Sequence, residues 1–187
     1  MVIDNEDSPK PLKLKDNEIL SPFMEYLKPT CIDIKPGDSL IIYRTQDQIP
    51  VDDYGQMPRP RRKMKEGALS QKLTKKEVDS LSPKKRKKIM GEWGLSCNDS
   101  EEAARQNFLY TYEKLENKGA SKEDLDAFVH ERGNKICRYI ITCSTGLITP
   151  FDEHGHANLY LYEGVNLENF RDLEYNYVTI DYQKDGN

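Results

Sequence analysis

The sequence lacks the long apolar segments that a membrane-spanning helix requires. Its uninterrupted apolar runs are short, Leu40 to Tyr43 being among the longest, whereas a spanning helix needs about 20 such residues. Only 36% of the 187 residues are hydrophobic, and the first residues show no basic-then-apolar secretory pattern. We therefore expect an intracellular, cytoplasmic protein that is neither secreted nor embedded in a membrane.

Cysteine is scarce and has no paired spacing. The chain contains no C-x-x-C motif, whereas a zinc site of the finger type needs ligand pairs a few residues apart. In an intracellular protein such thiols stay reduced. Cys137 and Cys143 share one face of an extended segment with Tyr139 and Ile141, which predicts core packing and inert thiols. The four cysteines are Cys31, Cys97, Cys137 and Cys143.

Recognisable catalytic motifs are also missing. The sequence has no nucleophile elbow G-x-S-x-G, no phosphate loop G-x-x-x-x-G-K-[ST] and no dinucleotide fingerprint G-x-G-x-x-G. Acidic pairs such as Glu101–Glu102 stand in predicted helix first turns, where the helix dipole already favours them. We therefore assign no catalytic residues and no cofactor, and expect a protein that is not an enzyme.

The segment 152–156 is the one metal-like cluster. His154 and His156 would lie on one side of an extended segment, and the neighbouring carboxylates of Asp152 and Glu153 could complete a site. This pattern leaves a small metal-dependent enzyme as an alternative. The same residues have the composition of a hairpin turn between two strand-like runs. Because a turn needs no metal, we assign no metal ligands.

Charge is distributed unevenly along the chain. The formal net charge is only −4. Residues 59–88 contain thirteen basic and three acidic residues, whereas the flanking segments 1–58 and 89–187 have net charges of −5 and −9. A segment of net charge +10 in an otherwise acidic chain favours contact with a polyanion or an acidic partner.

Two clusters supply most of this positive charge. The first, residues 59–65, lies beside prolines that block regular structure, so we expect an exposed loop or arm. The second, residues 84–88, follows Ser82 and Pro83, a typical N-cap and first helical residue. We expect the basic side chains of both clusters to face solvent and to bind nucleic acid or an acidic partner: Arg59, Arg61, Arg62, Lys63, Lys84, Lys85, Arg86, Lys87 and Lys88.

Other interpretations of the two clusters stay open. A run of lysine and arginine also resembles a nuclear-import signal. Alternatively, the basic residues form a solvated face that is neutralised by the acidic segments of the same chain. Self-neutralisation predicts that these basic side chains form ion pairs with carboxylates of this protein, whereas ligand binding predicts that they do not.

The middle of the chain carries helix signals. Thr74 and Glu77 form a capping box, and a second helix follows Ser82 and ends at Gly94. Apolar residues at spacings of three and four predict helices over 99–118 and 121–132, joined by a turn at Gly119. The residues predicted to face the core are Ile89, Met90, Trp93, Phe108, Tyr112, Leu115, Leu125 and Phe128.

Alternation with a period of two predicts strands near both ends of the chain. The predicted strands are 39–44, 135–143, a short one at 147–149, 157–163 and 175–182. The tyrosine-rich last strand suits a sheet edge or a subunit contact. The order of elements predicts an α+β fold, with about four central helices followed by a small, mainly antiparallel sheet and with long loops.

The domain organisation follows from composition. Residues 1–18 are polar and acidic and predict a flexible arm, while 19–187 form a single α+β domain that includes the basic loop and helix 59–93. The leading hypothesis is a non-catalytic interaction protein that contacts a polyanion, with nucleic acid first. The alternative is a structural subunit of a larger, virus- or phage-like assembly, with homo- or hetero-oligomeric contacts.

Overall fold

The computed structural model describes residues 12–53, 55–58, 60–61 and 72–182. The fold is α+β, as the order of sequence signals predicts. The elements are α1 (Asn17–Leu20), η1 (Ser21–Phe23), α2 (Met24–Leu27), η2 (Lys28–Thr30), β1 (Leu40–Gln46), α4 (Lys75–Ser80), α5 (Pro83–Glu92), β2 (Leu95–Asn98), α6 (Glu101–Glu116), α7 (Lys122–Arg132), β3 (Lys135–Ile141), β4 (Gly146–Ile148), β5 (His156–Leu161), η3 (Leu167–Phe170) and β6 (Val178–Thr179).

The strands form one antiparallel sheet in the order β4-β5-β2-β1-β3-β6. The longest ladder joins β1 to β3 and runs from the pair Leu40–Ile141 to the pair Gln46–Lys135. The last strand, β6, is shorter than predicted and lies at the sheet edge, as its tyrosine-rich sequence suggests. The short strand β2 was not predicted, because four residues after a glycine give little periodic signal.

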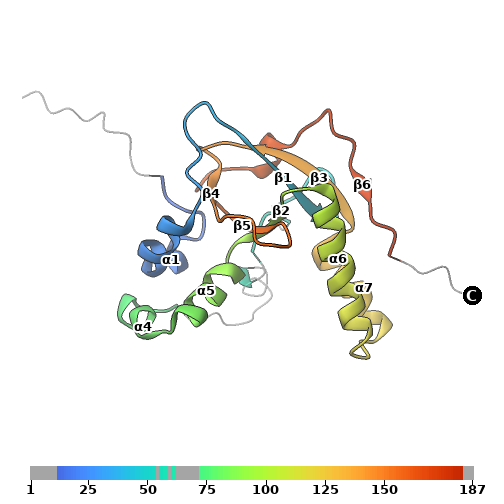
Figure 1. Cartoon of the computed structure of the whole chain (residues 1–187), viewed down its shortest axis with the longest axis horizontal. Helices are drawn as coiled ribbons and strands as arrows, with labels where there is room; N and C mark the ends of the chain where they lie inside the picture. Colours follow the sequence, from blue (N-terminus) through green and yellow to red (C-terminus); the bar gives the residue numbers. More distant parts are fainter. Residues whose placement is uncertain (1–11, 54, 59, 62–71, 183–187) are drawn as a thin grey trace, which may run out of the picture.

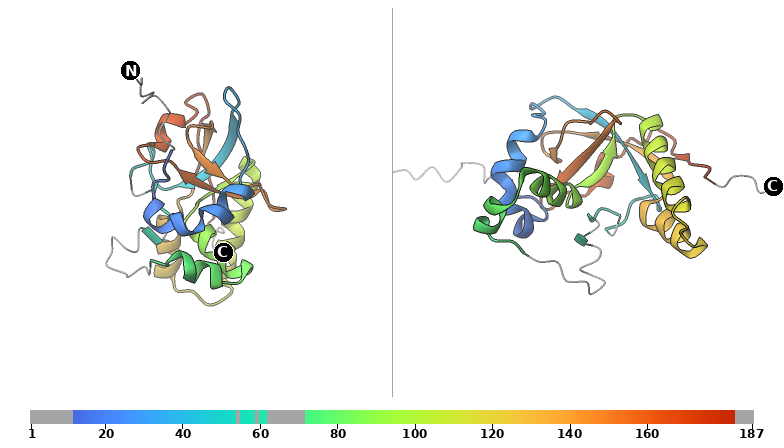
Figure 2. Two further views of the ribbon diagram at one scale, coloured as in Figure 1. Left: turned by 90° about the vertical axis from the view of Figure 1, so that its left-hand side faces the viewer. Right: turned by 60° about the horizontal axis from the view of Figure 1, so that its bottom comes forward.

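The helices form two separate groups against the sheet. In Figure 1, α1, α4 and α5 lie together at one side of the molecule, and α6 and α7 lie at the other; the right-hand view of Figure 2 shows the same separation. The first group encloses a cluster that contains Phe23, Val78 and Trp93. The second group packs Ala104 and Phe108 against the sheet. We call residues 72–93, which contain α4 and α5, the basic lobe.

The caps predicted at Thr74 and Ser82 are present, and Ser121 caps a third helix. Thr74 and Ser121 each form a capping box, with Glu77 and Asp124 respectively, and the Ser82 side chain accepts a hydrogen bond from the Lys85 N–H. These caps satisfy backbone donors that would otherwise have no partner in the first turn. The predicted helices are confirmed in position and type. Of their predicted core residues, Leu115 and Leu125 are only partly buried and lie outside the cluster around Phe108.

Residues 1–18 were predicted to form a flexible arm, but residues 12–18, the part that the structure describes, pack against the body of the protein. Leu14 is 2% exposed and forms a β-bridge with Tyr162, and Asp16 is buried. Residues 12–18 therefore lie on the body, because a buried leucine anchors them there. Residues 1–11 lie outside the described part of the chain.

Strands β1 and β2 diverge soon after they meet, and this divergence shapes the centre of the molecule. They share the single pair Tyr43–Asn98. Beyond it the side chain of Arg44, 5% exposed, spans the gap and donates from Nε to the Ser96 carbonyl oxygen at 3.0 Å.

The end of α7 packs against β1 at Gly133, where φ is +75° and an added Cβ would lie 1.8 Å from the Gln46 carbonyl carbon. Only glycine fits this junction.

Candidate nucleic-acid interface

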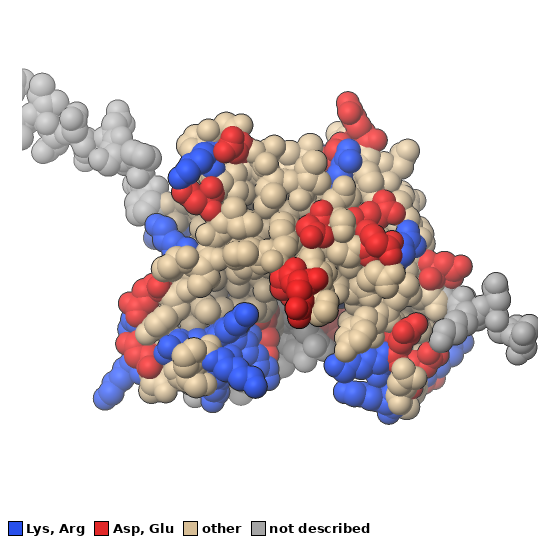
Figure 3. Space-filling model, viewed as in Figure 1, with Lys and Arg blue, Asp and Glu red and all other residues tan. Residues whose placement is uncertain are grey.

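Helix α5 places its four lysines on the face opposite its buried apolar residues. At 3.6 residues per turn, its four lysines occupy an arc of roughly 160°, centred opposite Met90 and Trp93. All four are exposed, and Lys and Arg side chains gather at the lower left of Figure 3, over α4 and α5. We call this surface the α5 basic face; its members are Lys84, Lys85, Lys87 and Lys88.

The opposite side of α5 fixes the helix to the body. Met90 and Trp93 are buried in the cluster that also contains Phe23 and Val78. The Tyr160 hydroxyl of strand β5 donates a hydrogen bond to the Met90 carbonyl oxygen at 3.1 Å. The α5 basic face is therefore held in a fixed orientation by the apolar side of the same helix.

Two other cations of the basic lobe, Lys75 and Arg86, are engaged within the protein. Lys75 forms ion pairs with Glu25 and Asp79. Arg86 donates from Nη1 to the carbonyl oxygens of Val78, Asp79 and Leu81, and its guanidinium lies 4.2 Å from the centre of the Tyr26 ring. Arg86 is therefore only partly exposed, because it caps the end of α4.

Arg61 is likewise a structural residue. Its side chain is 22% exposed, and Nη2 lies 2.6 Å from Asp16 Oδ1 and 2.7 Å from Glu18 Oε1. The guanidinium carbon lies 5.5 Å from the centre of the Trp93 ring. The expected solvent-facing position is wrong for Arg61, because these contacts hold it against the body. The other basic residues predicted in this cluster, Arg59, Arg62 and Lys63, lie outside the described residues.

We expect Arg61→Ala to lower stability without removing nucleic-acid binding. The change leaves the buried carboxylate of Asp16 without the guanidinium beside it, and breaking a partly buried pair of this kind costs between about 1 and 3 kcal/mol. Urea denaturation should show a lower midpoint with an unchanged slope. Loss of nucleic-acid affinity at full folding would instead place Arg61 in the interface.

The segment 152–155 is a turn, as its composition favours. Asp152 Oδ1 accepts hydrogen bonds from the backbone N–H groups of His154 and His156, and Gly155 has a φ of +68°. Burial opposes ionisation of Asp152, but these backbone donors prevail and lower its pKa. The described residues contain no group of three or more metal-ligating side chains.

All four cysteines are free thiols, and burial suppresses the reactivity of Cys31, Cys97 and Cys137. Burial raises the pKa of Cys97 to about 12 and the pKa values of Cys31 and Cys137 to about 11. Since the thiolate is the reactive form, these thiols stay protonated at neutral pH. The packing role predicted for Cys137 agrees with its burial beside Tyr139 and Ile141 in the sheet core.

A polar cluster that sequence analysis missed lies between the two helix groups. The Ser96 hydroxyl lies 2.9 Å from His156 Nε2 and accepts a hydrogen bond from Arg132 Nη2 at 3.2 Å. Burial, and secondarily the positive charge of Arg132, lower the pKa of His156. The imidazole and the hydroxyl share one hydrogen bond, so Ser96, His156 and Arg132 form one hydrogen-bonded set.

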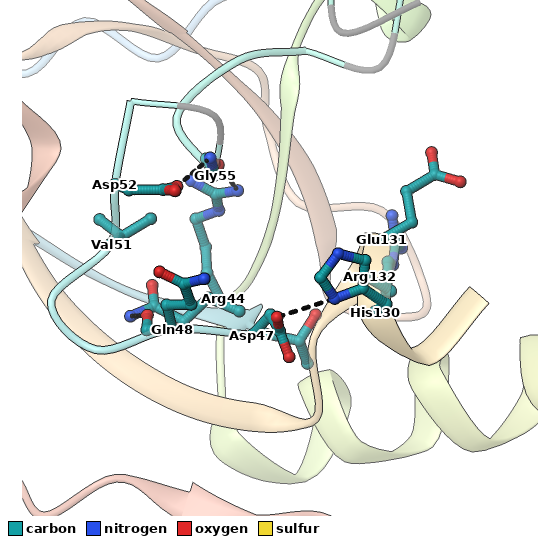
Figure 4. A pocket seen from close by; sticks show the side chains of 11 residues that line it. Arg44, Asp47, Gln48, Val51, Asp52, Gly55, His130, Glu131 and Arg132 are labelled. Carbon is teal, nitrogen blue, oxygen red and sulfur yellow. Dashed lines mark hydrogen bonds and ion pairs between the residues drawn. The ribbon is translucent and has the colours of Figure 1, made fainter. Parts of the chain in front are cut away.

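This polar cluster lines a cavity of about 410 Å³. A neighbouring cavity of about 300 Å³ shares Arg44 and Arg132 with it. In Figure 4, Arg44 rises from β1 toward Gly55, while His130 reaches Asp47 from α7, with 3.0 Å between Nδ1 and Oδ2. The residues come from β1, β2, β5 and α7, which are far apart in the sequence, so no local motif could have indicated them.

Comparisons with protein-family models, curated proteins and solved structures found no significant match to this chain. Within the described residues, no helix has both the length and the apolar content needed to cross a membrane.

Proposed function

We propose that this protein binds nucleic acid through the α5 basic face. The observation that carries the proposal is that four neighbouring lysines are exposed and form no ion pair with any described carboxylate. Nearby cations such as Arg61, Lys72 and Lys75 do form such pairs. Among the described residues, carboxylates therefore pair with those cations and not with the lysines of the α5 basic face, which stay available to a ligand.

The placement of these lysines opposes helix stability. Lys84 and Lys85 stand in the first turn of α5, which has no acidic residue, where the helix dipole disfavours positive charge. Lys84 also lies three and four residues from Lys87 and Lys88, and each like-charge pair at such spacing costs about 0.2–0.5 kcal/mol. A bound polyanion would relieve both costs, so the arrangement suits binding better than it suits folding.

The basic lobe is also locally distinct in net charge. It contains eight basic and three acidic residues, whereas α6 and α7 with their connection, residues 101–132, contain five basic and eight acidic residues. Figure 3 shows blue side chains grouped over α4 and α5, and blue mixed with red over α6 and α7. A polyanion would be attracted to the first surface and repelled by much of the second.

Salt dependence tests this function directly. With four to six phosphates neutralised, log K should fall against log salt with a slope of about −4 to −5, and with little dependence on base sequence. Fluorescence anisotropy of a labelled oligonucleotide, measured from about 50 mM to 200 mM salt, gives this slope. Undetectable binding at the lowest salt concentration would refute the proposal.

A second candidate is a subunit of a larger assembly, and exposed apolar side chains favour it. Ile41 and Ile140 are paired across β1 and β3 and are 45% and 39% exposed, and Leu173 is 77% exposed. Such side chains suit a subunit contact. Light scattering over a range of protein concentrations distinguishes the candidates. For an assembly subunit, the mean particle mass rises with protein concentration.

A further inference from the structure

The cavity that holds Ser96, His156 and Arg132 lies at the end of the α5 basic face. Counted from Lys84, Lys87 and Lys88 lie three and four residues along α5, and Gly91 lies seven residues along. Gly91 lines the cavity. Residues at these spacings share one helix face. The distance from Lys84 to Gly91 along the axis is about 10 Å, close to the length of three nucleotides at about 3.4 Å per phosphate of one strand.

The polar wall of the cavity can hold an anionic group. Arg44 and Arg132 both line it, and a guanidinium has five N–H donors in a geometry that matches phosphate oxygens. The Ser96 hydroxyl and the His156 imidazole add polar groups that lie between strands β2 and β5. Charge-assisted hydrogen bonds to phosphate are stronger than neutral ones.

The remaining walls suit the rest of a nucleotide. Leu115 and Phe128 provide apolar surface, and an aromatic ring can stack on a base. Glu92 and Glu131 also line the cavity, and their carboxylates are acceptors for sugar hydroxyls or base amino groups. The cavity of about 410 Å³ falls in the range of small-molecule sites, which is about 300–1,000 Å³.

We propose that this cavity binds the phosphate-bearing terminal nucleotide of a nucleic-acid strand that lies along the α5 basic face. The inference rests on the proposed nucleic-acid function and adds to it a preference for strand ends. Arg132, Ser96 and His156 hold the terminal phosphate, while the base and sugar contact the wall formed by Leu115 and Phe128. Internal nucleotides contact the lysines of α5.

The test compares single-stranded oligonucleotides of one sequence that carry a 5′-phosphate, a 3′-phosphate or neither. We expect one phosphorylated end to bind at least about tenfold more tightly than the unphosphorylated strand, because charge-assisted hydrogen bonds are added. Equal affinity of all three strands, measured with a protein that shows a salt slope of about −3 to −4 on single strands, would overturn the inference but leave the proposed function intact.

Two variants assign the preference to the cavity. Arg132→Gln removes a phosphate donor, and Gly91→Leu fills the cavity from the helix side; an added Cβ at Gly91 meets nothing closer than Asn158 Nδ2 at 3.7 Å. Both should bind the unphosphorylated strand with the affinity and salt slope of the natural protein, and should lose the preference for a phosphorylated end. A preference that persists in folded Gly91→Leu protein would also overturn the inference.

Adenosine 5′-monophosphate distinguishes a free nucleotide from a strand end. Titration is followed by the NMR signals of the His156 imidazole, assigned with His156→Gln. A shift of these signals together with the end preference supports the inference. A shift without detectable oligonucleotide binding makes the cavity a mononucleotide site and refutes the strand-end inference and the proposed function together. Absence of both the shift and the end preference overturns the inference.

Discussion

Replacing Lys84, Lys85, Lys87 and Lys88 together with glutamine should weaken nucleic-acid binding by at least about a hundredfold at 50 mM salt. The slope of log K against log salt should fall from about −4 or −5 to near −1, because each lost phosphate contact removes about 0.9. Thermal stability should be unchanged or slightly higher, since the variant removes like-charge pairs and first-turn positive charge from α5.

A matched control comes from the other helix group. Lys114, Lys118 and Lys122 are also exposed and lie at the turn between α6 and α7. Their triple replacement with glutamine changes net charge by a similar amount, yet should leave the slope within about one unit of the original. Equal losses in both variants would mean that net charge, rather than the α5 basic face, controls binding.

Phe108→Ala should lower the free energy of unfolding by about 3–5 kcal/mol. Phe108 is 1% exposed, and its ring centre lies 5.3 Å from that of Phe128 and 5.8 Å from that of Tyr182. Removing the ring leaves a cavity between α6, α7 and the sheet that a well-packed core fills only partly. Urea denaturation followed by fluorescence or circular dichroism measures the change.

Tyr110 provides the control on the same helix. It is 65% exposed, so Tyr110→Ala should change stability by less than about 0.5 kcal/mol. If Phe108→Ala is as mild as this control, α6 does not pack through Phe108, and the core assignment of the helix pair is wrong.

The helices could be predicted because their signals are local. The capping residues Thr74 and Ser121 stand within four residues of the backbone groups that they satisfy, so the sequence displays them directly. The glycine turns at Gly119 and Gly133 are equally local, with φ values of +78° and +75°. Period-two alternation likewise located β3, the strand with the longest ladder.

The partners of the charged residues could not be predicted in this way. Arg61 and Asp16 are 45 positions apart and meet because Leu14 anchors the N-terminal segment on β5. Ser96 and His156 are 60 positions apart and meet through the β2–β5 ladder, although β2 was itself not predicted. Charge in a sequence shows where cations are concentrated, but tertiary contacts decide which of them stay available for a ligand.

Lysine footprinting measures the proposed interface most directly. The protein is acetylated with and without a bound oligonucleotide, and the modification of each lysine is quantified by mass spectrometry. The account predicts protection of Lys84, Lys85, Lys87 and Lys88, while Lys114, Lys118 and Lys122 react equally in both samples. Bound oligonucleotide that leaves the α5 lysines fully reactive would contradict it.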